Sequence, residues 1–246
     1  MTNRYASFSA WMASPLGQYL AIRELAYFDQ TVMDLFGFNA LQLGLSGMDL
    51  LRNSRISHRF QVDTVNTASV LAEPTHLPFA EQSIDLLVLP HLLEFSAYPH
   101  QILREAERVL IAEGSLLISG FNPHSLWGLH SWYKRRGGDF PWCGGFINFG
   151  RLKDWLSLLG CDMVSWRMCC YAPPFDNADW VHRFKFMETA GDRWWAMGGG
   201  VYFIHAVKRV HGMRLITPRW QGKPQLVNAL RPVARSLQKD MKLSDE

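Results

Sequence analysis

Residues of the kinds that bind ligands stand at the ends of predicted strands: Gly44, Gly47, Asp63, Glu73 and His91. A carboxylate can accept hydrogen bonds from two hydroxyl groups, and small loop residues let backbone N–H groups approach a ligand. A histidine can exchange a proton near neutral pH. These residue types at strand ends predict a ligand-binding edge.

The loop after the first predicted strand has fewer glycines than a dinucleotide-binding loop. Gly44 and Gly47 are present with Ser46 between them, but the third glycine of a G-x-G-x-x-G pattern is missing. Asp63 lies 19 positions after Gly44, which is close to the spacing of a ribose-binding carboxylate. The interpretation of this loop therefore depends on the segments that follow it.

Apolar periodicity and turn residues predict alternating helices and strands. Ser14 and Pro15 are suited to begin a helix, which we expect to end near Gly37. We predict strands over residues 41–45, 58–63, 69–73, 84–90 and 115–121, helices over 98–111 and 149–160, and late strands over 161–173 and 201–210. A tryptophan-rich, helical insertion is expected at residues 176–197, between the two late strands.

This alternation predicts an α/β fold with a mostly parallel sheet of about six or seven strands, closed by an antiparallel strand near the end. Ligands of such sheets bind beyond the carboxyl ends of the strands, near the point where the strand order reverses. The loop at 44–47, Asp63, Glu73 and His91 all fall at predicted strand ends. We therefore expect four separate segments to meet at one edge of the sheet.

The composition is that of a globular protein: of 246 residues, 48% are hydrophobic and 19% are charged. No uninterrupted apolar run reaches about 18 residues, so no membrane span is expected. The N-terminus lacks the apolar region of a secretory signal, which favours a cytoplasmic location.

The cysteines form no C-x-x-C pair, so we interpret them as buried, reduced thiols and expect no metal site. In a strand, Cys169 and Cys170 would point to opposite faces.

Charge is unevenly distributed along the chain. Residues 1–207 carry a net charge of −3, whereas residues 208–246 carry +6. The last segment contains prolines and an apolar stripe too short to form a core, so we expect a poorly ordered or loosely docked basic extension. Such a tail can attract nucleic acid, but a solvated tail without a specific partner is the favoured interpretation.

The middle of the chain contains an ordered series of motifs. They are Glu73, then Leu77-Pro78-Phe79, then Asp85 leading a hydrophobic strand, then Arg108-Val109-Leu110, and then Gly114 before another strand. This series resembles the class I S-adenosylmethionine-dependent methyltransferases of the type 11 group. With its lead-in "LFGFNALQLGLSG", the chain resembles the bacterial YafS-like subgroup, over roughly residues 14–209.

The resemblance implies a Rossmann-like class I methyltransferase fold, with a mostly parallel seven-stranded sheet and an antiparallel C-terminal strand. It implies a helical segment at 1–38 that packs on a methyltransferase-like domain at 39–210, followed by the basic extension at 211–246. The implied cofactor is S-adenosyl-L-methionine. Its methionine part would lie against the loop of Gly44, Ser46 and Gly47, its ribose against Asp63 and its adenine against Glu73.

Other residues near the predicted edge have both functional and structural interpretations. His91 follows the fourth strand, where we expect it to border the cofactor, and it is the candidate catalytic residue. Asp85 precedes that strand, where a hydrogen-bonding role in the scaffold is favoured. His124, Trp127 and His130 follow the fifth strand, where they can contact a methyl acceptor or pack a loop.

Three functions remain open from the sequence. The first is methyl transfer to a small-molecule acceptor. The second is a binding or regulatory protein with a decayed cofactor site, which is favoured by Gln42 in place of an acid, by Ser46 in place of a glycine and by Pro74 after Glu73. The third is a nucleic-acid methyltransferase that uses the basic tail; it is less favoured because the rest of the chain is net acidic. The acceptor and the oligomeric state are not determined by the sequence.

Overall fold

The structure is a computed structural model of the chain, and it describes residues 4–64, 68–134, 140–177, 179, 183–184, 186–195 and 197–210. The chain divides into two units, Met1–His211 and Gly212–Glu246. The second unit, and with it the predicted basic extension, lies outside the described residues. Within the described part, no helix has the length and apolar character needed to cross a membrane.

Helices and strands alternate only in the second half of the described chain, because the first four strands follow one another with no described helix between them. The helices are α1 (Arg4–Met12), α2 (Pro15–Val32), α3 (Pro99–Val109), α4 (Leu126–Lys134), α5 (Phe149–Leu158) and α7 (Phe186–Trp194), with a 3-10 turn η1 (Leu93–Phe95). The strands are β1 (Asn39–Leu43), β2 (His58–Asp63), β3 (Val70–Leu71), β4 (Ile84–Pro90), β5 (Leu110–Phe121), β6 (Cys161–Cys169) and β7 (Val201–Lys208).

Among the described residues, the strands form one seven-stranded sheet in the order β3-β2-β1-β4-β5-β7-β6. The five strands from β3 to β5 are parallel, and β7 runs antiparallel between β5 and β6. This arrangement confirms the predicted α/β fold and its antiparallel C-terminal strand. The carboxyl ends of β1, β2, β4, β5 and β6 therefore lie at one edge of the sheet, where β7 begins.

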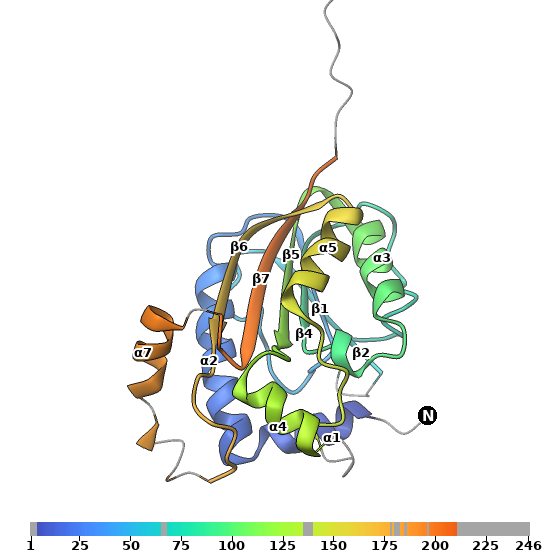
Figure 1. The fold of residues 1–246 in the computed structure, drawn as a ribbon. Coiled ribbons are helices and arrows are strands. Elements are labelled where there is room, and N and C mark those ends of the chain that lie inside the picture. Colours follow the sequence, from blue (N-terminus) through green and yellow to red (C-terminus); the bar gives the residue numbers. More distant parts are fainter. Residues whose placement is uncertain are drawn as a thin grey trace, which may run out of the picture. The chain divides into compact units, whose positions relative to one another are not determined.

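Both faces of the sheet are covered, and alternate residues of each strand enter different cores. In β4, Leu87 and Leu89 pack with α3 and α5, whereas Leu86 and Val88 pack with α1 and α2. Figure 1 shows α3 and α5 on one side of the sheet and α2 on the other. Helices α1 and α4 lie together at the end of the sheet where β5 ends (Figure 1).

The N-terminal segment forms two helices, of which the sequence predicted only the second. Helix α2 begins as expected, because the Ser14 hydroxyl accepts a hydrogen bond from Gly17 N at 3.2 Å. It ends at Val32, before the predicted end near Gly37. A side chain at Gly17 would lie 2.3 Å from the carbonyl oxygen of Trp11, so only glycine permits this close approach of α1 and α2.

Two further local predictions differ from the structure. The residues between the helix predicted at 98–111 and the strand predicted at 115–121 lie inside β5, where Glu113 adopts a φ of 63° and the pairing with β4 shifts. Cys169 and Cys170 do not lie on opposite faces. Strand β6 ends at Cys169 and Cys170 adopts a φ of 63°, so their sulfur atoms lie 3.4 Å apart as buried free thiols.

Candidate functional site

The loop after β1 is a tight turn held by a buried glutamine. Gly44 and Leu45 both adopt positive φ values, of 79° and 51°, and so turn the chain sharply. The amide nitrogen of Gln42 donates to the carbonyl oxygens of Gly44, Leu45 and Met48 at 3.1, 3.2 and 2.8 Å. Its amide oxygen accepts from Leu50 N at 3.0 Å. An amide can serve as donor and acceptor together, so Gln42 fastens both sides of the loop.

The carboxylate predicted to follow β2 lies directly beside this loop. Asp63 is buried, and its Oδ2 accepts a hydrogen bond from Ser46 N at 3.3 Å. Its Oδ1 accepts from Thr64 N at 2.7 Å. A carboxylate has about four acceptor positions, so these backbone groups use only part of its capacity. Next to Ser46, the space beside Gly47 is open, because an added Cβ would meet no atom within 4 Å.

Glu73 lies in a different environment from Asp63. It is exposed, and it lines an open depression of the surface together with His76, Glu105 and Arg108. Arg108 forms an ion pair with Glu105 at 2.9 Å, which fixes the wall of that depression. The structure therefore brings Ser46 and Asp63 into contact and places Glu73 beside α3.

His91 follows β4 and is buried between two carboxylates. Its Nε2 lies 3.1 Å from Glu24 Oε1, and its Nδ1 lies 3.3 Å from Glu94 Oε2. Among the described residues, neither ring nitrogen of His91 has a hydrogen-bond partner, and neither has the Oε2 atom of Glu24 or Glu94. We call these three side chains the buried ion cluster. Ser119 and the Phe121 N–H group donate to its carboxylates.

The buried ion cluster determines the charge of His91. Burial lowers the pKa of His91, but the negative charges of Glu24 and then Glu94 outweigh it and raise the pKa to about 10. At neutral pH the ring is thus a positively charged imidazolium, which cannot take up a further proton. In this arrangement His91 joins α2 to the sheet edge. The prediction that it is catalytic or contacts a cofactor stays a prediction.

Aromatic side chains from α1 cover the same edge of the sheet. The ring of Phe8 lies 5.6 Å from that of His91 and 4.9 Å from that of Phe95. The ring of Trp11 lies 6.3 Å from that of Phe121, at the end of β5. These contacts exclude solvent from the carboxyl ends of β4 and β5.

Sequence reasoning did not identify Glu24. The sequence does contain a pattern that places Glu24 on a buried face, because Leu20, Glu24 and Phe28 recur at four-residue intervals on the apolar face of α2. An acidic residue on an otherwise buried face requires a partner in the interior. The partner could not be named, since it follows a strand 67 positions further along the chain.

Asp85 has the structural role that the sequence favoured. Its Oδ2 accepts hydrogen bonds from the N–H groups of Phe38 and Asn39 at 3.0 and 2.9 Å, which anchors the start of β1.

Replacement of Asp85 by alanine should lower the free energy of unfolding by about 1–3 kcal/mol, because both donors lose a charged acceptor. Urea denaturation measures this change. An equal loss on replacement of the exposed Asp162 by alanine would contradict it.

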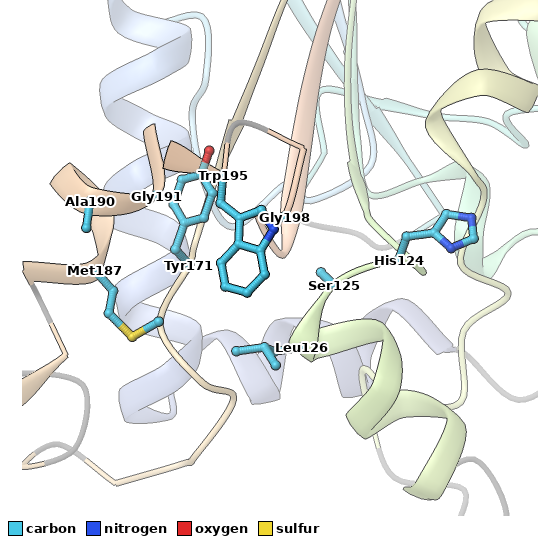
Figure 2. Close-up of a pocket in the computed structure, with 9 residues that line it drawn as sticks. All are labelled: His124, Ser125, Leu126, Tyr171, Met187, Ala190, Gly191, Trp195 and Gly198. Carbon is cyan, nitrogen blue, oxygen red and sulfur yellow. The ribbon is translucent and has the colours of Figure 1, made fainter. Parts of the chain in front are cut away.

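The residues expected near an acceptor have separate positions. Trp127 belongs to the core, where its Nε1 donates to Ala172 O at 2.8 Å. The ring of His130 packs on Trp142, with centroids 4.6 Å apart. His124 lines a cavity of about 380 Å³ that lies between the start of α4 and α7. Figure 2 shows Leu126 and Met187 entering this space from those two helices.

Comparison with known proteins finds similarity in the central part of the chain. Residues 39–118, which hold most of the parallel sheet, match the family model of a methyltransferase domain. The protein YafS of Escherichia coli (strain K12) is 39% identical over 132 residues, an alignment that covers 53% of this chain and 55% of YafS. The chain thus aligns with about half the length of this curated relative.

Solved structures share the fold at low sequence identity. A SAM-dependent methyltransferase from Thermotoga maritima has a TM-score of 0.59 at 14% identity, covering 83% of this chain and all of that chain. A chain from the complex of the Haloferax volcanii Trm112 methyltransferase activator with a methyltransferase has a TM-score of 0.56 at 14% identity, covering 85% and 98%. Residues 39–118 are thus similar to the methyltransferase domain family, and the seven-stranded fold is shared with solved methyltransferase structures.

Proposed function

We propose that this chain binds S-adenosyl-L-methionine beside the loop after β1 and transfers its methyl group to a small-molecule acceptor. The observation that carries the proposal is the contact between Ser46 N and the buried Asp63 carboxylate. It joins a glycine-containing turn to an acidic strand end at the edge where parallel sheets bind ligands. The contact lies inside the segment that matches the methyltransferase family.

The residues of this edge fit an adenosyl group. Asp63 has unused acceptor capacity for ribose hydroxyls, and the open side of Gly47 gives a ligand access to the backbone. Glu73 is exposed and offers an acceptor for the adenine amino group, in the role that the family resemblance implies. The likeness to the methyltransferases supports the same ligand.

Methyl transfer requires little covalent chemistry from this chain. When bound, the cofactor supplies a methyl group on a sulfonium, which keeps the bonding electron pair on sulfur as the acceptor bonds to the methyl carbon. The protein has to hold both molecules in line and exclude water. Phe8 and Trp11 exclude water at the ends of β4 and β5, and the buried ion cluster keeps α2 against that edge.

Calorimetric titration with S-adenosylmethionine and S-adenosylhomocysteine tests the proposal. Asp63→Ala and Glu73→Ala should each weaken binding roughly tenfold or more, since a lost charged acceptor costs about 1.5–3 kcal/mol. The exposed Asp162→Ala serves as the control and should bind as the unaltered protein does. Thermal melting of each variant separates a lost ligand contact from a lost fold.

Two outcomes would count against the proposal. Absence of binding by the unaltered protein at millimolar ligand would favour a protein with a decayed cofactor site. Variants that bind normally would mean that the cofactor lies elsewhere. A cytoplasmic location and a nucleic-acid partner for the basic tail stay predictions from the sequence.

A further inference from the structure

The cavity between α4 and α7 has the size of a small-molecule site. Its volume is about 380 Å³, and its walls come from the segment after β5, the end of β6 and the insertion before β7. Ligand pockets in proteins have volumes of roughly 300–1,000 Å³. The cavity lies at the same edge of the sheet as the loop after β1, because β5 and β6 end there and β7 begins there.

The lining of the cavity is apolar. Its large side chains include Leu126, Tyr171, Met187 and Trp195, and no lysine, arginine, aspartate or glutamate is among the lining residues that the structure describes. Figure 2 shows the rings of Tyr171 and Trp195 among the side chains that line the cavity. Such a lining binds a ligand by burial of apolar surface, and its described side chains give a charged ligand no counter-ion.

Two polar side chains of the lining, those of His124 and Ser125, already have partners inside the protein. The ring of His124 contacts the Asn148 side-chain amide at 2.7 Å, and Figure 2 shows it turned away from the cavity. The Ser125 hydroxyl donates to Asn122 O at 2.6 Å and accepts from Gly128 N at 3.1 Å. Neither group needs a ligand to satisfy it. The lining therefore selects an uncharged, apolar molecule.

The wall formed by α7 is held in place by its own contacts. Glu188 is buried, accepts from Tyr171 N at 2.9 Å and also accepts from the hydroxyl of Tyr19 on α2. Gly191 packs so closely on Tyr171 that an added Cβ would lie 2.3 Å from the ring. These contacts keep α7 at a fixed distance from β6, so the cavity exists before any ligand binds.

We infer that this cavity binds an uncharged, mainly apolar small molecule and that such a molecule is the methyl acceptor. The assignment as acceptor site rests on the proposed function, whereas binding itself does not. The inference depends on the volume of the cavity, on its apolar lining and on the contacts that hold α7 in place. The cavity also lies at the sheet edge where the cofactor is proposed to bind.

Titration with N-phenyl-1-naphthylamine, a neutral apolar fluorophore, tests binding in the full chain. The unaltered protein should enhance its fluorescence with saturation. Ala190→Phe fills the cavity and should weaken binding about tenfold. Thr189→Phe adds the same ring at a neighbouring exposed position of α7 that does not line the cavity, and should leave the affinity within about twofold.

A second pair of variants probes the opposite wall. Leu126→Asp places a charge in the apolar lining and should also weaken the probe about tenfold. Leu129→Asp, at an exposed position of the same helix outside the lining, should not. Failure of the unaltered protein to bind the probe, or equal affinity in all four variants, would overturn the inference.

Parallel calorimetry with S-adenosylmethionine separates this inference from the proposed function. Cofactor binding without probe binding overturns the apolar site and leaves the methyltransferase proposal standing. Probe binding without cofactor binding supports the apolar site and overturns its assignment to a methyl acceptor. The whole inference is supported if the unaltered protein binds both the probe and S-adenosylmethionine, and if only Ala190→Phe and Leu126→Asp have a lower affinity for the probe.

Discussion

Replacement of His91 by asparagine should lower the free energy of unfolding by about 3–5 kcal/mol, because it leaves two buried carboxylates without their counter-ion. Asparagine is the suitable substitute, since His91 adopts a φ of 45° and asparagine tolerates that region better than most residues. Urea denaturation at pH 7 measures the loss. The exposed His58 provides the control, and His58→Asn should change stability by less than about 0.5 kcal/mol.

A triple variant tests whether charge is the cause. With Glu24→Gln and Glu94→Gln added to His91→Asn, no uncompensated charge remains in the cluster. A large part of the lost stability should return, because a neutral buried group avoids most of the cost of desolvation. If the triple variant is as unstable as the single one, packing and not charge explains the effect.

The buried ion cluster should also make stability depend on pH. The pKa of His91 is raised to about 10 in the folded protein, against about 6.5 when unfolded, so the folded state binds more protons between these values. Its contribution to stability is fully present below pH 6.5 and is lost as the pH rises through 10. Unfolding free energy should therefore fall more steeply between pH 7 and 10 in the unaltered protein than in the triple variant. Parallel curves would contradict this assignment.

Replacement of Gln42 by glutamate should lower the free energy of unfolding by about 3 kcal/mol or more at pH 7, because it buries an unpaired charge. The amide nitrogen of Gln42 donates to three carbonyl oxygens, and a carboxylate in its place would face them without any proton to share. Loss of these bonds should also release the turn after β1. Denaturation and calorimetry with S-adenosylmethionine measure the two effects.

The direction in which the stability of Gln42→Glu changes with pH shows whether the introduced charge causes the loss. Burial raises the pKa of a carboxyl above its usual value of about 4.3, so Gln42→Glu should be least destabilising near pH 5 and become worse as the pH rises. Gln61, which pairs with Gln42 on β2 and is half-buried, is the matched control. Gln61→Glu should cost less than about 1 kcal/mol. An equal cost at both positions would show that the loop does not depend on the amide.

Local sequence signals predicted the sheet well. Strands β2 and β4 have their predicted bounds, since each is a short apolar or alternating run that ends at a turn residue. Helix α2 begins at Pro15 because a serine cap and a proline act within one turn. Helix α1 gave no such signal. Its side chains Phe8 and Trp11 are stabilised by contacts with His91, β5 and α4 that no local pattern contains.

The positions of the candidate residues followed from the sequence only where a strand places them. Asp63 follows a recognisable strand at a spacing typical of nucleotide-binding units, and the structure places it on the loop of Ser46. Glu73 has an equally clear position in the sequence, yet it lies in the depression beside α3. Strand β3 is only two residues long, so the chain after it is directed by packing on α3 and not by the strand.

The sequence by itself determined the fold class, the order of the strands along the chain and the edge at which the candidate residues stand. These follow from periodicity, turn residues and the parallel connection rule, all of which act over short distances. Only the tertiary structure decided the partners of the buried groups. Glu24 meets Ser119 across 95 positions, and Tyr19 meets Glu188 across 169, so the ion cluster and the cavity wall depend on which elements the whole fold brings together.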